Sequence, residues 1–237
     1  MTADRERVDV ESRLARRDDG YKPPPVNGPD MDPQEFVDAV REDNRTALSR
    51  LGSSKALYAD TGGELEDEAV LGAAADRAHH AAEAFEAWGA DESHGGAADL
   101  FAATADSERD HVETIADERG GYEPGDPPAV ARHLRTVEGT AARLGAFVGW
   151  ALAADNNAGQ VVGYFVGQAS PRTANAFRDL GEDYETYLAD AREVLANACG
   201  DDDWERAREA AGDAVAADYD DYFETLESLG VNPKPVC

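Results

Sequence analysis

The spacing of apolar residues most constrains the fold, because after residue 31 it repeats with the period of an α-helix and shows no strand pattern. Glycine pairs and prolines stand where helices are expected to end and begin. The pattern predicts helices over 33–58, 66–90, 96–119, 127–156, 159–168, 173–198 and 203–229. Short links favour antiparallel neighbours. We therefore predict an all-α protein, an antiparallel helical bundle of about six long helices.

The first 31 residues differ from the rest in charge. They carry seven acidic and six basic residues, and they end in a proline-rich stretch, Pro23–Pro25, followed by Asn27, Gly28 and Pro29. Residues 32–237 carry almost all of the net negative charge. We expect residues 1–31 to be a mobile N-terminal tail, or a short helix, with a linker, and residues 32–237 to form a single helical-bundle domain.

The charge balance is extreme, with 50 acidic against 22 basic residues and a net charge of -28. Such self-repulsion opposes a compact fold at low salt. At 1 M salt the Debye length is about 3 Å, so the repulsion is largely screened. The composition predicts a cytoplasmic protein of a salt-accumulating halophile, with an acidic mesophile protein as the alternative.

The same composition bears on partners. Phosphate binding needs clustered Lys and Arg, so the sequence argues against nucleic acid as a partner. The most apolar run, 144–154, has 11 residues and is too short to span a bilayer, so no membrane partner is expected.

The strongest candidate for chemistry is Glu108 with His111 on the predicted helix 96–119. Residues three apart share a helical face, and the helical wheel places both in the apolar stripe. Glu-x-x-His is the spacing that metal-binding bundles use. Mirrored across a turn near residue 123, Glu138 comes level with Glu108, and Asp218 lies at the edge of the stripe of the last helix.

Two interpretations of this pair remain open, besides an error in the predicted helix register. The first is a buried polar cluster of Glu108, His111, Glu138 and Asn44, neutralised by Arg208. The second is a metal site, with Glu108, His111 and Glu138 as ligands and Asp218 as an extra one. Carboxylate and imidazole ligands suit iron or manganese.

An apparent twin of the motif lies at Asp76 and His79. The apolar stripe of the predicted helix 66–90 runs along the other side, so the wheel places Asp76, His79 and Glu83 on a solvated polar face.

Small residues recur every four positions at Ala141, Gly145, Gly149 and Ala153, and again at Gly159, Gly163 and Gly167. This spacing lets two helices approach closely. The pattern is typical of a buried central helix. The alternative is a homo-oligomer interface, formed by Gly145, Gly149, Gly159, Gly163 and Gly167.

Three runs carry a resemblance to a known family: 47–55 (ALSRLGSSK), 161–167 (VVGYFVG) and 230–237 (GVNPKPVC). Together they resemble a haloarchaeal family of acidic helical proteins, over most of residues 33–237. Members carry ferritin-like or rubrerythrin-type labels, or a transcription antitermination label. The last label implies contact with RNA, which the charge of this chain opposes.

The ferritin-like label implies a di-iron carboxylate site, with Glu-x-x-His on two helices and a lone Glu on two more. Glu108 and His111 match one such motif, and Glu138 could serve as a lone Glu. This chain departs from the pattern because no second inward Glu-x-x-His exists and Glu42 is expected to face out.

Two functions follow from these observations. One is a non-catalytic bundle protein with a buried Glu/His cluster that associates with itself or a partner. The alternative is a ferritin-like, rubrerythrin-type protein that binds iron or manganese and acts on oxygen species or iron.

Overall fold

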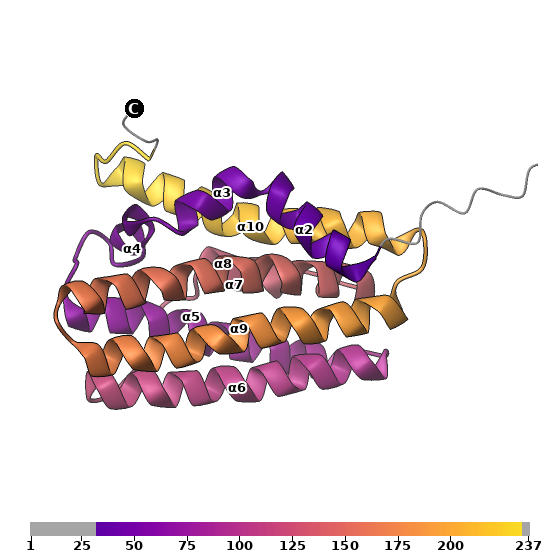
Figure 1. Cartoon of the computed structure of the whole chain (residues 1–237), viewed down its shortest axis with the longest axis horizontal. Helices are drawn as coiled ribbons and strands as arrows, with labels where there is room; N and C mark the ends of the chain where they lie inside the picture. Colours follow the sequence, from indigo (N-terminus) through magenta and orange to yellow (C-terminus); the bar gives the residue numbers. More distant parts are fainter. Residues whose placement is uncertain (1–31, 234–237) are drawn as a thin grey trace, which may run out of the picture. The chain divides into compact units, whose positions relative to one another are not determined.

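The computed structural model describes residues 32–233, and within this range the chain forms helices and no strand, which confirms the all-α prediction (Figure 1). Four short helices accompany five long ones in this range. In chain order they are α2 (Pro33–Asp43), α3 (Arg45–Leu51), α4 (Ser54–Asp60), α5 (Asp67–Asp91), α6 (Gly95–Arg119), α7 (Ala129–Leu134), α8 (Thr140–Gly167), α9 (Pro171–Ala198) and α10 (Asp203–Ser228).

Three predicted helices, 33–58, 127–156 and 159–168, are divided differently in the structure. The predicted helix 33–58 is divided into α2, α3 and α4. The break predicted at 157–158 is absent, and it lies instead at 135–139, where Gly139 takes a left-handed φ of 86° that ordinary residues avoid. Asn157 continues α8 as a buried residue, and its side chain donates to Asp60 at 2.6 Å.

The segment between α6 and α8 crosses the length of α5. Arg119, at the end of α6, hydrogen-bonds to Glu68 at the start of α5. Arg143, near the start of α8, pairs with Asp91 at the end of α5. Residues 120–139 therefore travel from one end of α5 to the other, and α6 and α8 run in the same direction.

Side chains of α5 fasten this crossover. Asp76 accepts a hydrogen bond from the Gly125 amide at 2.7 Å, and the Trp88 indole donates to the Leu134 carbonyl at 3.2 Å. The prediction of antiparallel neighbours is confirmed for α5 and α6, because Arg119 at the end of α6 contacts Glu68 at the start of α5. It is wrong for α6 and α8, which the crossover joins in the same direction.

α8 and α10 also run in the same direction, and they touch through glycine. A Cβ at Gly145 would overlap the backbone of Ala207, and one at Gly149 would overlap the backbone of Ala211. A step of four residues along α8 therefore matches a step of four along α10 in the same chain direction, so the two helices are parallel. Both glycines pack α8 against α10 within the chain, as expected of a buried central helix and not of the alternative oligomer interface.

Gly159, Gly163 and Gly167 differ, because a Cβ at any of them would meet nothing within 4 Å. For these three, self-association stays a prediction. Within 32–233 no helix is both long and apolar enough to cross a bilayer. The predicted tail at residues 1–31 lies outside the described residues.

We expect Gly145→Ala and Gly163→Ala to change stability in opposite directions. The first forces a methyl group into the α8–α10 contact and should lower the free energy of unfolding by about 1–3 kcal/mol. The second adds helix propensity in open space and should raise it by up to about 1 kcal/mol. Denaturant unfolding of both variants in molar salt checks this, and equal effects would contradict the assigned packing.

Candidate functional site

A small cavity of about 30 Å³ lies inside the bundle, bounded by residues of all five long helices and of α7. This volume has room for one or two water molecules or an ion. Most of its lining is apolar, and six polar or charged side chains interrupt that lining: Arg77, Glu108, His111, Asn157, Tyr184 and Asp218.

α6 places Glu108 and His111 in this cavity. Ala105 and Ile115 bury the same face of the helix against the core, and Glu108 and His111 share that face. Glu108 is 0% exposed and His111 2% exposed. The inward orientation expected from the helical wheel is confirmed for both.

His111 stands between two carboxylates. Its Nδ1 lies 3.1 Å from Glu108 Oε1, and its Nε2 lies 2.9 Å from Asp183 Oδ2 on α9. The Nδ1–Oε1 contact is at ion-pair distance, and Nδ1 and both Glu108 oxygens lack partners that meet hydrogen-bond geometry among the described residues. The Tyr187 hydroxyl, which also lacks such a partner, is close enough to Glu108 to lower the pKa of that carboxyl. Asp183 is 46% exposed, so the series of groups runs from the cavity to solvent.

The pair holds protons more tightly than free side chains do. Burial raises the pKa of Glu108, and the contact with His111 offsets this only in part. Burial lowers the pKa of His111, but Glu108 and Asp183 outweigh it, so that pKa is also raised. A proton on this pair therefore compensates a buried charge that would otherwise be costly.

Arg77 supplies the permanent positive charge at the cavity. Its guanidinium makes two hydrogen bonds to Asp218, at 3.0 and 3.1 Å, and two to Asp60, at 2.7 and 3.3 Å. Burial alone would lower the pKa of Arg77, but the two aspartates outweigh it and raise that pKa further. Arg77 was not a predicted site residue, although on the helical wheel it lies only about 40° from the buried Ala81.

The structure brings three of the four predicted metal ligands to the cavity. Glu108, His111 and Asp218 line it, but the carboxylate of Asp218 is bound to Arg77. Glu138 is exposed in the turn between α7 and α8, so its placement beside Glu108 is wrong. The reason is that residues 120–139 form a crossover, and mirroring across residue 123 assumes a hairpin.

The other members of the predicted polar cluster lie elsewhere. Arg208 is exposed and pairs with Asp43 at 2.5 Å, so it does not neutralise Glu108. Asn44 is half-buried, and its side chain donates to the Val40 carbonyl of its own helix turn. The cation of the cavity is Arg77 instead.

Negative charge exceeds positive charge around the cavity. The described contacts form two sets: Glu108 and Asp183 contact His111, and Asp218 and Asp60 contact the Arg77 guanidinium. His111 contributes one further positive charge when protonated. Buried carboxylates need such compensation, so this region favours uptake of protons or of a metal cation.

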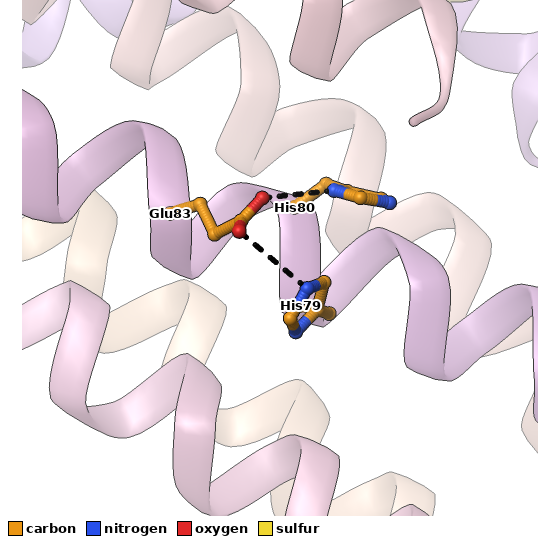
Figure 2. Close-up of side chains that lie close together, drawn as sticks. All are labelled: His79, His80 and Glu83. Carbon is orange, nitrogen blue, oxygen red and sulfur yellow. Dashed lines mark hydrogen bonds and ion pairs between the residues drawn. The ribbon is translucent and has the colours of Figure 1, made fainter. Parts of the chain in front are cut away.

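The helical wheel predicts that the polar face of α5 is solvated, but in the structure its side chains also make contacts. Asp76 accepts hydrogen bonds from the Tyr122 hydroxyl and the Gly125 amide. The side chains of His79, His80 and Glu83 gather on this face (Figure 2). Within the described residues they are the one group of three whose ligand atoms all lie within 4.8 Å of one another.

We expect the Glu108–His111 pair to make the metal-free protein less stable as pH rises. Both pKa values are raised in the folded state, so the stability they contribute is present below the unfolded values of 4.5 and 6.5 and is lost above them. We compare the wild type with the double variant Glu108→Gln/His111→Gln. Above about pH 6.5, the difference in their free energies of unfolding should fall by up to about 1.4 kcal/mol per pH unit for each proton released. Denaturant unfolding with a chelator measures this, and a difference independent of pH would contradict it.

Comparisons with known proteins give no information on the site. A scan against protein-family models, a search of curated proteins and a search of solved structures found no match to this chain. The resemblance to a haloarchaeal family therefore stays a prediction.

Proposed function

We propose that this chain is a metal-binding helical-bundle protein of a halophile's cytoplasm, in which Glu108 and His111 Nδ1 hold one iron or manganese ion. The observation that carries the proposal is the approach of Glu108 Oε1 to Nδ1 at 3.1 Å without a hydrogen bond between them. Two ligands about 2.1 Å from one ion at a right angle are roughly 3 Å apart, which matches this separation. Carboxylate with imidazole is a donor set for iron and manganese.

Asp183 supports this role of His111. A histidine that binds a metal through one ring nitrogen usually donates the other N–H to a carboxylate or carbonyl, which fixes the ring. Nε2 of His111 lies 2.9 Å from Asp183 Oδ2, so the ring presents the lone pair of its Nδ1 to the cavity when neutral. The contact thus selects the nitrogen that faces Glu108.

The topology supports a ferritin-like bundle. Ferritin-like folds join two helical hairpins by one long crossover, and here residues 120–139 join α5–α6 to α8–α9. The site itself departs from the di-iron pattern. The one other carboxylate among the residues that line the cavity is Asp218, which Arg77 binds, so we propose one ion, with water completing its coordination.

A second candidate is the non-catalytic bundle with a buried polar cluster, in which a proton takes the place of the metal. The observation that favours it is the pairing of Asp218 with Arg77, which removes the nearest further carboxylate from the ligand set. In this case Glu108→Gln should leave the free energy of unfolding unchanged or raise it, because a buried charge disappears.

Metal analysis distinguishes the two candidates. We expect protein purified in molar salt without chelators, then loaded anaerobically with Fe(II) or Mn(II), to retain about one ion per chain in the cavity. Glu108→Gln should lose it, since the amide lacks the charge. Glu113→Gln removes an exposed carboxylate from the same helix and should keep it.

Asp183→Asn tests the orienting contact and should weaken binding by about 10- to 100-fold. A wild type that retains no more metal than Glu108→Gln after loading would overturn the proposal and leave the polar cluster.

A further inference from the structure

A second arrangement of metal-type ligands lies on the outer face of α5. His79 and Glu83 are one helical turn apart, and His80 precedes Glu83 by three residues. Figure 2 shows the Glu83 carboxylate facing both imidazoles, with one dashed contact to each. Its Oε2 lies 3.1 Å from His80 Nδ1, and its Oε1 lies 3.7 Å from His79 Nε2.

The His80 ring is fixed in the orientation that a ligand needs. Its Nε2 lies 2.9 Å from the Gly125 carbonyl oxygen of the crossover. Because a carbonyl oxygen only accepts, Nε2 carries the hydrogen, and neutral His80 presents a lone pair at Nδ1. Histidines that bind metal commonly have this hydrogen bond to a carbonyl. His80 is 6% exposed, so packing also holds the ring.

A cation already faces these ligand atoms. Arg135, which follows α7 in the crossover, places Nη2 2.7 Å from Glu83 Oε2 and 3.1 Å from His80 Nδ1. The side chain of Arg135 is 38% exposed and has solvent into which it can move.

We propose that His79, His80 and Glu83 form a surface site for a divalent transition metal, and that the metal and Arg135 compete for it. Two imidazoles and a carboxylate are the donor set of many zinc sites. Ligands of a tetrahedral zinc ion are roughly 3.3 Å apart, so small side-chain rotations bring the three groups into place. Binding replaces the contact of Arg135 with His80 Nδ1 and leaves the His80–Gly125 hydrogen bond intact.

The test is zinc titration of the full chain against a chromophoric chelator, in molar KCl with excess Mg²⁺ to occupy non-specific carboxylates. The titrations use the Glu108→Gln background, which removes the interior site proposed above. We expect one zinc ion per chain, weakened at least about tenfold in His79→Ala and in Glu83→Gln. Both residues are partly or fully exposed, so both variants should fold.

Glu86→Gln is the matched control, since Glu86 is also an exposed carboxylate of α5, and it should bind zinc as the background does. Arg135→Gln should bind about three- to fivefold more tightly, because an exposed ion pair worth up to about 1 kcal/mol no longer competes. Arg135→Lys keeps the charge and should stay near the background.

Two results would overturn the proposal. One is the same zinc affinity in the background, His79→Ala and Glu83→Gln proteins. The other is weaker binding in Arg135→Gln, because that would make Arg135 a support of the site and not a competitor. Neither result depends on whether Glu108 and His111 bind a metal.

Discussion

The crossover at 120–139 is the constraint on which the rest of the bundle depends. Outside α7, the backbone groups of this link have no helix to pair them, so they need other partners. α5 supplies them, since Asp76 and His80 bind the two polar groups of Gly125 and Trp88 binds the Leu134 carbonyl. This path sets the direction of α8. It also places Arg135 over the outer face of α5 and leaves Glu138 in a solvent-exposed turn.

The charged side chains of Arg77 and Glu108 both line the interior cavity, but their surroundings differ. The Arg77 guanidinium has hydrogen-bond partners in Asp218 and Asp60, which also balance its charge. Glu108 differs, because neither of its carboxylate oxygens has a hydrogen-bond partner among the described residues. A fully buried carboxylate in that state is destabilising unless a proton or a cation joins it. The chemical interest of the cavity therefore lies at Glu108 and His111.

The helices and their inward faces could be predicted from the sequence, since periodicity depends on local geometry alone. That reasoning located Glu108, His111 and the buried stripe of α5. The predicted places of Glu138 and Arg208 were wrong, because each depends on which helices meet and in which direction. Arg77 was missed although the wheel places it near the buried stripe of α5. Gly145 and Gly149 illustrate the limit. Their spacing indicates close helix packing, but only the tertiary structure shows that the partner is α10 of the same chain.

Histidine, rather than carboxylate, decides where a metal would bind in such an acidic chain. With 50 acidic residues, carboxylates are abundant everywhere, and the molar salt that the composition predicts supplies alkali cations to screen them. Imidazole nitrogen suits transition metals, whereas ions that prefer oxygen leave it free. The chain has five histidines, and three of them lie in the two arrangements described, each with one ring nitrogen near a carboxylate of its own helix. For His80 and His111 the other nitrogen meets an oxygen acceptor from a different segment, so tertiary structure fixes which nitrogen is left to bind. Selectivity would then arise from the few imidazoles that the fold has oriented, and the acidic surface would contribute only a general attraction for cations.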